Sequence, residues 1–198
     1  LPNAQVFLAG ANADLVRDIN KFSNNVMARH LFLTLSAEPE GTGGREDRST
    51  HILNAWLQAK DLDIPDVAVE NGSGLSRTER ISAQSIARLL ISAYGSQVMP
   101  EFIGSLPLVA VDGTMRTRLR RDIMAGQAHI KTGGLNNVST IAGYVRAADG
   151  RRYAVAFFVN HANAAASTVA QDLLLRWVHR GADQSFAARK GAIKGNIR

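Results

Sequence analysis

The stretch Gly126–Val145, "GQAHIKTGGLNNVSTIAGYV", decides the fold because it holds two apolar, β-prone runs separated by glycines and asparagines. The runs "AHIKT" (128–132) and "STIAGYVRA" (139–147) predict consecutive strands, and "RRYAVAFFVN" (151–160) predicts a third. The tripeptide "ADG" at 148–150 is a hairpin signal between the last two runs. The final third of the sequence therefore predicts an antiparallel meander.

Helical periodicity dominates the sequence before this meander. Apolar residues at helical spacing between positions 15 and 35 predict two helices that are separated by the polar stretch Ser23-Asn24-Asn25. Further along, the sequence predicts a loop at 38–47 and a helix at 52–57. A short strand that enters a glycine turn is predicted within 66–77, followed by a helix at 82–95 that is capped by Ser82 and Gly95.

The C-terminal run "NAAASTVAQDLLLRWVHRG" (163–181) predicts a last helix with Val169, Leu173 and Trp177 on one face. No internal repeat or linker separates the helical part from the strand-rich part. We therefore expect one domain of α+β type over 1–180, an antiparallel sheet flanked by helices, followed by a loosely ordered tail at 181–198.

Composition restricts the classes of function. The 198 residues are 45% hydrophobic, and no apolar run is long enough for a transmembrane segment. Lys and Arg outnumber Asp and Glu by 23 to 17, but the basic residues are scattered and no aromatics alternate with them. This pattern argues against nucleic acid as a partner and suits attraction to an acidic cell envelope. Cysteines are absent, which excludes disulfides and thiolate metal sites.

The triplet Lys131-Thr132-Gly133 ends the first predicted strand. From this position the lysine and threonine side chains could face a cleft, while Gly133 would let a ligand lie against the backbone. The alternative is an exposed lysine at a strand end. A second triplet, Ser23-Asn24-Asn25, places a hydroxyl and an amide at a helix break, for which the alternative is an ordinary helix cap.

The two triplets occur in the order found in the penicillin-recognising serine enzymes, where Ser-x-x-Lys is followed by Ser-x-Asn and then by Lys-Thr-Gly. Lys131 follows Ser23 by 108 positions. Together with "INKFSNNVMARHLF", "ENGSGLSR" and "LPLVAVDGTMRTRL", they resemble the C-terminal part of the transpeptidase domain of class C low-molecular-mass penicillin-binding proteins. The resemblance runs to about Arg180. It implies a periplasmic D-alanyl-D-alanine carboxypeptidase or endopeptidase that acts on peptidoglycan stem peptides and is inhibited by β-lactams.

The resemblance also implies roles for individual residues. Lys131 and Thr132 would hold the terminal carboxylate of the substrate, and the Gly134 N–H would be one donor of the oxyanion hole. Ser23 would relay a proton to the leaving nitrogen, and the Asn25 amide would hold the substrate backbone and the lysine of the missing Ser-x-x-Lys motif. We expect Ser23, Asn25, Lys131 and Thr132 to converge on one cleft. Leu75 and Arg77 of "GSGLSR" would line the pocket for the peptide side chain.

Two departures from the family pattern stand out. Asn71 occupies a position where the family suggests an Asp, so an acidic role there is in doubt. No Ser-x-x-Lys occurs ahead of Ser23, although this motif carries the nucleophile and its base in the family. We therefore expect the chain to be the C-terminal part of a longer protein, with the missing N-terminal portion as its partner, and to be inactive alone.

Other polar residues suggest no cofactor or metal. "RTRLRR" (116–121) predicts a solvated helical face, and His129 should share a strand face with Lys131. The remaining histidines have no ligand spacing; they are His30, His51, His161 and His179. Two other functions remain open beside the carboxypeptidase. One is a β-lactamase, in which deacylation is fast, and the other is a non-catalytic module that binds peptidoglycan peptides.

Overall fold

A computed structural model of the protein describes residues 11–37, 43–62 and 64–181. Contacts between Cα atoms divide the chain into two compact units, unit 1 (1–106) and unit 2 (107–198), where the sequence predicted one domain. The tail predicted at 181–198 lies, after its first residue, outside the described residues. The helical and strand-rich parts of the sequence thus correspond to separate compact units.

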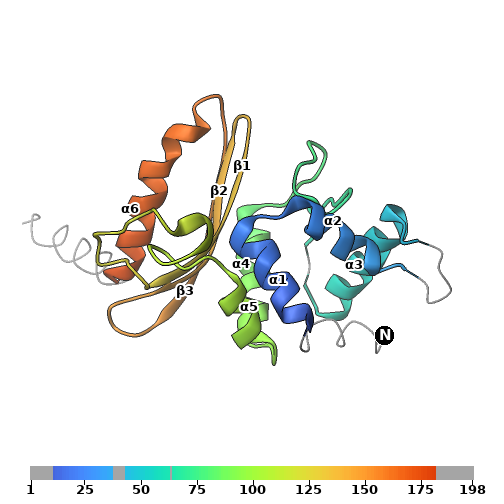
Figure 1. Ribbon diagram of the computed structural model, residues 1–198, viewed down its shortest axis with the longest axis horizontal. Helices are drawn as coiled ribbons and strands as arrows, with labels where there is room; N and C mark the ends of the chain where they lie inside the picture. Colours follow the sequence, from blue (N-terminus) through green and yellow to red (C-terminus); the bar gives the residue numbers. More distant parts are fainter. Residues whose placement is uncertain (1–10, 38–42, 63, 182–198) are drawn as a thin grey trace, which may run out of the picture. The chain divides into compact units, whose positions relative to one another are not determined.

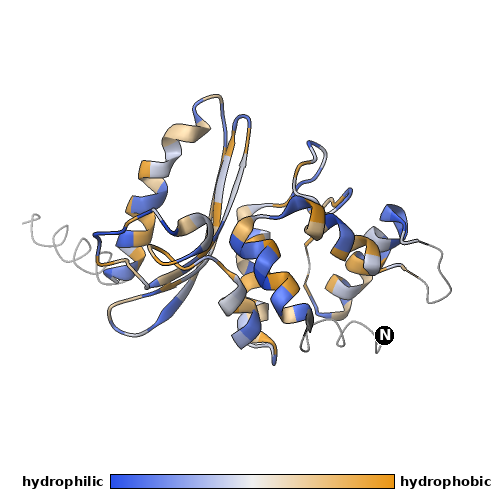
Figure 2. Cartoon of the chain, in the orientation of Figure 1, coloured by the Kyte–Doolittle hydropathy of each residue, from blue (hydrophilic) through white to orange (hydrophobic). Residues whose placement is uncertain are grey.

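Unit 1 is helical. Its helices are α1 (Ala11–Phe22), α2 (Asn25–Thr34), α3 (Glu46–Ala59), α4 (Ala83–Tyr94) and α5 (Met99–Ser105) (Figure 1). The predicted break between α1 and α2 is confirmed. The short α5 was not predicted; a proline in its first turn suits a helix start, where the missing N–H costs nothing. Figure 2 shows hydrophilic and hydrophobic residues interleaved along α1 and α2, as expected for helices that pack on one side.

The start of α4 is fixed by a cluster of side chains. Ser82 is the N-cap, as predicted, and its Oγ accepts a hydrogen bond from the Ser85 N–H at 3.0 Å. Asp66 accepts from the Ser85 hydroxyl and from the Ser82 N–H, both at 2.6 Å. Hydrogen bonds from Ser85 and Ser82 lower the pKa of Asp66 to about 2. At the other end, Gly95 caps the helix with a φ of −84°, so it is not a left-handed cap.

The strand predicted within 66–77 is wrong. Only one isolated bridge forms, in which Ala68 and Arg80 exchange backbone hydrogen bonds of 2.8 and 2.9 Å. The physical reason is a side chain that competes for the backbone, because Glu79 Oε1 accepts the N–H groups of three consecutive residues, at 3.2, 3.1 and 3.1 Å: Glu70, Asn71 and Gly72. The segment is therefore a loop that side chains hold in place.

Unit 2 is built on a three-stranded antiparallel sheet. The strands are β1 (Ala128–Leu135), β2 (Val138–Arg146) and β3 (Arg152–Asn160), in the order β1-β2-β3 (Figure 1). The predicted meander is confirmed. Asn137, with φ of 65°, adopts the left-handed conformation in the turn between β1 and β2, which asparagine tolerates well. The register pairs Lys131 with Ala142 and Gly134 with Ser139.

The helix α6 (Thr168–His179) packs on β2 with a face that was not predicted. Its buried residues are Gln171, Leu175 and Val178, of which Leu175 and Val178 join a core that includes strand residues such as Ile130, Ile141 and Val145. The predicted apolar face is exposed instead: Val169, Leu173 and Trp177 are 67%, 56% and 40% exposed.

Polar contacts flank the buried face of α6. Gln171 donates to Ser139 Oγ at 3.0 Å from the buried side. On the flank, Asp172 pairs with Arg118 at 2.7 Å, and Arg176 pairs with Asp122 at 2.7 Å. These contacts also correct the prediction for "RTRLRR", which forms turns rather than a solvated helix and carries a partly buried Arg118.

Candidate functional site

The Ser23–Asn25 turn joins α1 to α2. Ser23 has a φ of 52°, the left-handed region in which a non-glycine residue is strained by about 1 kcal/mol or more. Asn24 is the N-cap of α2, and its side chain accepts the Met27 N–H at 3.0 Å. The capping interpretation is thus confirmed for the middle residue of the triplet, while Asn25 has a different partner.

Asn25 connects this turn to the "GSGLSR" loop (72–77). Its Nδ2 donates to the backbone carbonyl of Ser73 at 2.6 Å, across 48 positions of sequence. Gly74 has a φ of 75°, and the Asn25 amide is the nearest group to the position of a Cβ on it, at 3.9 Å. Two segments that the sequence singled out separately are therefore in direct contact within unit 1.

The loop itself is rigidified by short-range hydrogen bonds. Asn71 Oδ1 accepts the Ser73 N–H at 2.9 Å, and Ser73 Oγ accepts the Leu75 N–H at 3.1 Å. At Asn71 the loop needs an acceptor rather than a charge, which an amide supplies as well as a carboxylate. Leu75 is 55% exposed and Arg77 is exposed, and their predicted place in a side-chain pocket stays a prediction.

Lys131 lies in the middle of β1. Its neighbours Ile130 and Ala128 are fully buried in the core, so Lys131 and His129 project from the opposite face of the strand, as predicted from the two-residue repeat. The Lys131 ammonium donates to the carbonyl of Thr132 at 2.7 Å. Burial lowers the pKa of Lys131, because the charged form loses water. The lysine is thus a partly desolvated cation on a rigid strand.

Thr132 and the two glycines complete the strand segment. The Thr132 hydroxyl donates to Thr114 Oγ1 at 2.8 Å; Thr114, in the 3-10 turn η3 (Gly113–Met115), is a residue that the sequence analysis missed. A Cβ on Gly133 would collide with Thr140 Oγ1, so the neighbouring strand by itself accounts for a residue without a side chain at this position. Gly134 is exposed, and its role as an oxyanion donor stays a prediction.

The two parts of the candidate site belong to different units. Ser23 and Asn25 lie in unit 1 with Leu75 and Arg77, whereas the Lys131–Gly134 segment lies in unit 2. The contact between Asn25 and the "GSGLSR" loop brings predicted residues together in unit 1, and neighbouring positions on β1 do so in unit 2. The convergence of all of them on one cleft stays a prediction.

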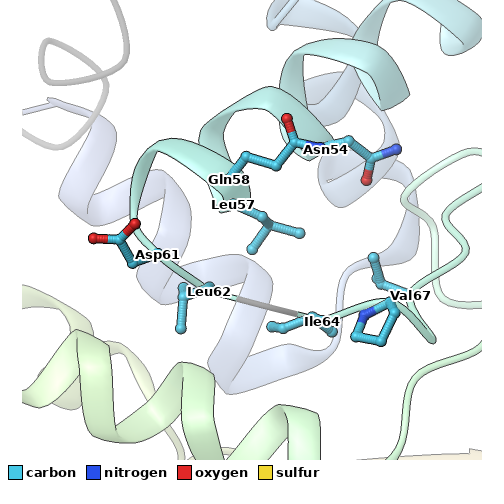
Figure 3. A pocket seen from close by; sticks show the side chains of 8 residues that line it. Asn54, Leu57, Gln58, Asp61, Leu62, Ile64 and Val67 are labelled. Carbon is cyan, nitrogen blue, oxygen red and sulfur yellow. The ribbon is translucent and has the colours of Figure 1, made fainter.

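Unit 1 also contains a pocket of about 610 Å³ that includes none of the predicted site residues. Figure 3 shows Leu57 and Ile64 within it, and the amides of Asn54 and Gln58 along one side. Within the described ranges, no group of three or more His, Asp or Glu side chains could hold a metal ion. Over the same residues, no helix is long and apolar enough to cross a membrane.

The chain resembles D-Ala-D-Ala carboxypeptidases in sequence. It is 30% identical over 135 residues to the D-alanyl-D-alanine carboxypeptidase of Actinomadura sp. (strain R39), a match that covers 66% of this chain and 25% of that protein. It is 25% identical over 149 residues to the D-alanyl-D-alanine carboxypeptidase DacB of Haemophilus influenzae, covering 74% of this chain and 31% of the relative. The matched region thus spans between a quarter and a third of these relatives.

Solved structures agree with this relationship. Penicillin-binding protein 4 of Haemophilus influenzae superposes with a TM-score of 0.68 at 25% identity, over 75% of this chain and 33% of that one. The extended-spectrum β-lactamase TLA-1 shares the fold at 12% identity, with a TM-score of 0.55 over 76% of this chain and 56% of that chain. The model of the "D-Ala-D-Ala carboxypeptidase 3 (S13) family" matches residues 12–180, and the chain therefore belongs to that family.

Proposed function

We propose that this chain carries part of the active site of a serine-type D-Ala-D-Ala carboxypeptidase or endopeptidase of the periplasm. Its substrates are the stem peptides of peptidoglycan, and β-lactams inhibit it by forming an acyl-enzyme. Membership of the S13 family supports a peptidase that acts on D-Ala-D-Ala bonds. The nucleophile and its base come from a part of the protein outside this chain, because the sequence contains no Ser-x-x-Lys.

One observation carries the proposal: the hydrogen bond from Asn25 to the Ser73 carbonyl, in a chain of this family. This contact fixes the Ser-x-Asn turn against the "GSGLSR" loop. Acyl transfer requires that the side chains which contact the substrate are held in defined positions. Ordinary helix capping needs only Asn24, so it does not account for the Asn25 contact.

The available groups fit the chemistry of acyl transfer. The partly desolvated Lys131 ammonium attracts the terminal carboxylate of the substrate, and the Thr132 hydroxyl hydrogen-bonds to it. The Gly134 N–H stabilises the oxyanion, while Ser23 passes a proton to the leaving D-Ala nitrogen. The nucleophile attacks the carbonyl carbon, the peptide bond breaks to release D-Ala, and water then hydrolyses the acyl-enzyme.

The test compares this chain with the full-length protein in labelling by a fluorescent penicillin. We expect stoichiometric labelling of the full-length protein and none of the 198-residue chain, because only the former holds an activated serine. Replacing the serine of the upstream Ser-x-x-Lys by Ala is the matched control and should abolish labelling. Stoichiometric labelling of the isolated chain would contradict the proposal.

The same preparation separates the other functions. A carboxypeptidase releases D-Ala from acylated D-Ala-D-Ala peptides and remains acylated by β-lactams for long periods. A β-lactamase would instead turn over the β-lactam rapidly and release little D-Ala. A binding module would retain the peptide and perform neither reaction, and this outcome would overturn the catalytic proposal.

A further inference from the structure

A buried lysine lies next to the Ser23 turn and has no place in the chemistry described above. Lys21, in the last turn of α1, is only 8% exposed, and its Nζ donates to the carbonyl of Leu106 at 2.7 Å. Burial of an ammonium group is unfavourable unless strong hydrogen bonds compensate for the lost water. An exposed lysine such as Lys60 keeps its water and carries no such penalty. The burial of Lys21 therefore requires an explanation.

The preceding residue reinforces the same attachment. Asn20 donates to Ser105 Oγ at 2.8 Å, and Ser105, which is 1% exposed, donates in turn to the carbonyl of Phe102 at 2.7 Å. Two consecutive residues at the end of α1 thus hold two consecutive residues at the end of α5, which we call the α1–α5 clamp (Asn20, Lys21, Ser105 and Leu106). The clamp fixes the backbone immediately before the left-handed Ser23.

The chain beyond Leu106 is equally well fixed. Pro107 has no conformational freedom in φ and restricts Leu106 to an extended conformation, which Leu106 adopts with a ψ of 144°. Within unit 2, the Ile130 N–H donates to the Pro107 carbonyl at 2.7 Å, and Ile130 directly precedes Lys131. The residue before Lys131 is therefore held to Pro107 within unit 2.

We propose that Lys21 is a positioning residue, which fixes the Ser23 turn to the end of α5 within unit 1. The proposal rests on the proposed function, in which Ser23 relays a proton. A relay group that moves by about 1 Å loses a large part of its effect on rate. In this role Lys21 acts through the position of Ser23, by its hydrogen bond to Leu106.

The test is a double-mutant cycle in the full-length protein, with the second-order rate constant of acylation by a fluorescent penicillin as the readout. We expect Lys21→Met to lower this constant by about 10- to 100-fold at a temperature well below the melting point, and Lys21→Arg to restore much of it. Lys60→Met is the matched control and should change it by less than about twofold. In a Ser23→Ala background, Lys21→Met should lower the acylation rate constant by less than about threefold, because the Ser23 hydroxyl that Lys21 positions is absent.

Other outcomes decide against the proposal. An equal loss in the presence and absence of the Ser23 hydroxyl would show that Lys21 supports the fold only. If Lys21→Met does not fold, the cycle is repeated with Asn20→Ala, which removes the other half of the clamp, and the same coupling to Ser23 is expected. A wild-type protein that is not acylated would contradict the proposed function itself, whereas an acylated wild type without coupling would contradict the role of Lys21 alone.

Discussion

The Ser23 turn and the Lys131 strand are positioned by different kinds of interaction. Lys131 is held by the backbone register of β1 on β2 and by fully buried neighbours such as Ile130. The Ser23 turn is held by side chains that reach backbone groups far along the sequence: Lys21 to Leu106, and Asn25 to Ser73. The strand is therefore robust to most surface changes, while the turn depends on a few named hydrogen bonds.

This difference predicts how each region responds to substitution. In the strand unit, we expect substitutions to lower stability mainly through steric conflict, because the close-packed sheet cannot accommodate added atoms. In the turn, we expect substitutions to lower stability through the loss of single hydrogen-bond donors and acceptors. Each of these contributes about 1 to 3 kcal/mol to stability when it is charged or buried.

The largest expected effect is on catalysis, from Lys131→Ala in the full-length protein. If Lys131 holds the substrate carboxylate as proposed, the loss of this partly desolvated cation should raise the barrier by about 2 to 4 kcal/mol, a decrease in kcat/KM of roughly thirtyfold to several hundredfold. The measurement is D-Ala release from an acylated D-Ala-D-Ala peptide. Lys60→Ala is the control and should be neutral, and a neutral Lys131→Ala would remove the lysine from the site.

The pH dependence of the wild type provides an independent check on Lys131. The side chain is cationic below its pKa, which burial lowers from 10.5. Activity on carboxylate-terminated peptides should therefore decline as the pH rises through that lowered value. Lys131→Arg keeps its charge to higher pH and should shift this decline upward.

The second prediction compares steric conflict in the two units. A Cβ on Gly143 of β2 would meet the backbone carbonyl of His129 well inside 3.0 Å, and the backbone cannot yield. A Cβ on Gly72 would meet the side chain of Phe32 at 2.5 Å. We expect Gly143→Ala to lower the free energy of unfolding by about 3 kcal/mol and Gly72→Ala by about 2, measured by denaturant unfolding. Gly104→Ala, where nothing lies within 4 Å, should be close to neutral.

The third prediction concerns Glu79, whose Oε1 accepts three backbone N–H groups of the loop. Glu79→Ala should destabilise the loop by about 1 to 2 kcal/mol, because these donors lose a charged acceptor. Amide hydrogen exchange of Asn71 and Gly72 should accelerate, while that of the sheet should not change. Unchanged exchange at these two amides would show that the loop does not depend on Glu79.

The smallest expected effect is selective. Arg77→Ala should lower kcat/KM by about five- to tenfold for peptides with a carboxylate-bearing side chain, since only these offer the guanidinium a partner. Simple acylated dipeptides should be unaffected. Equal losses on both substrates would remove Arg77 from the side-chain pocket.

Much of the strand unit could be predicted because its determinants are local in sequence. The apolar runs and the turn residues between 126 and 160 define the meander without any long-range information. The face of α6 could not be read in the same way. Leu175 and Val169 are both apolar, and the buried face packs on strands and pairs through its flank with Arg118 and Asp122, all of which are distant in sequence.

The contacts of the Ser23 turn and of the "GSGLSR" loop could not be predicted from local sequence. Helix periodicity locates the break at Ser23, but nothing local indicates that Lys21 is buried or that Asn25 binds Ser73. The strand predicted within 66–77 fails for the same reason, since Glu79 takes the N–H groups that a ladder would need. Side-chain to backbone bonds of this kind depend on the tertiary fold, and propensity does not encode them.

The Asp66 cluster at the start of α4 has a consequence for acid tolerance. Hydrogen bonds from Ser85 and Ser82 hold the pKa of this carboxyl at about 2, below its ordinary 3.8. A carboxyl whose pKa is depressed in the folded state contributes stability in full above its unfolded pKa, and this contribution declines as the pH falls from the unfolded to the folded value. At about pH 3, where an ordinary aspartate is largely protonated, Asp66 therefore still accepts both hydrogen bonds. The hydrogen bonds that Asp66 accepts at the start of α4 should consequently persist to a lower pH than those of an ordinary aspartate.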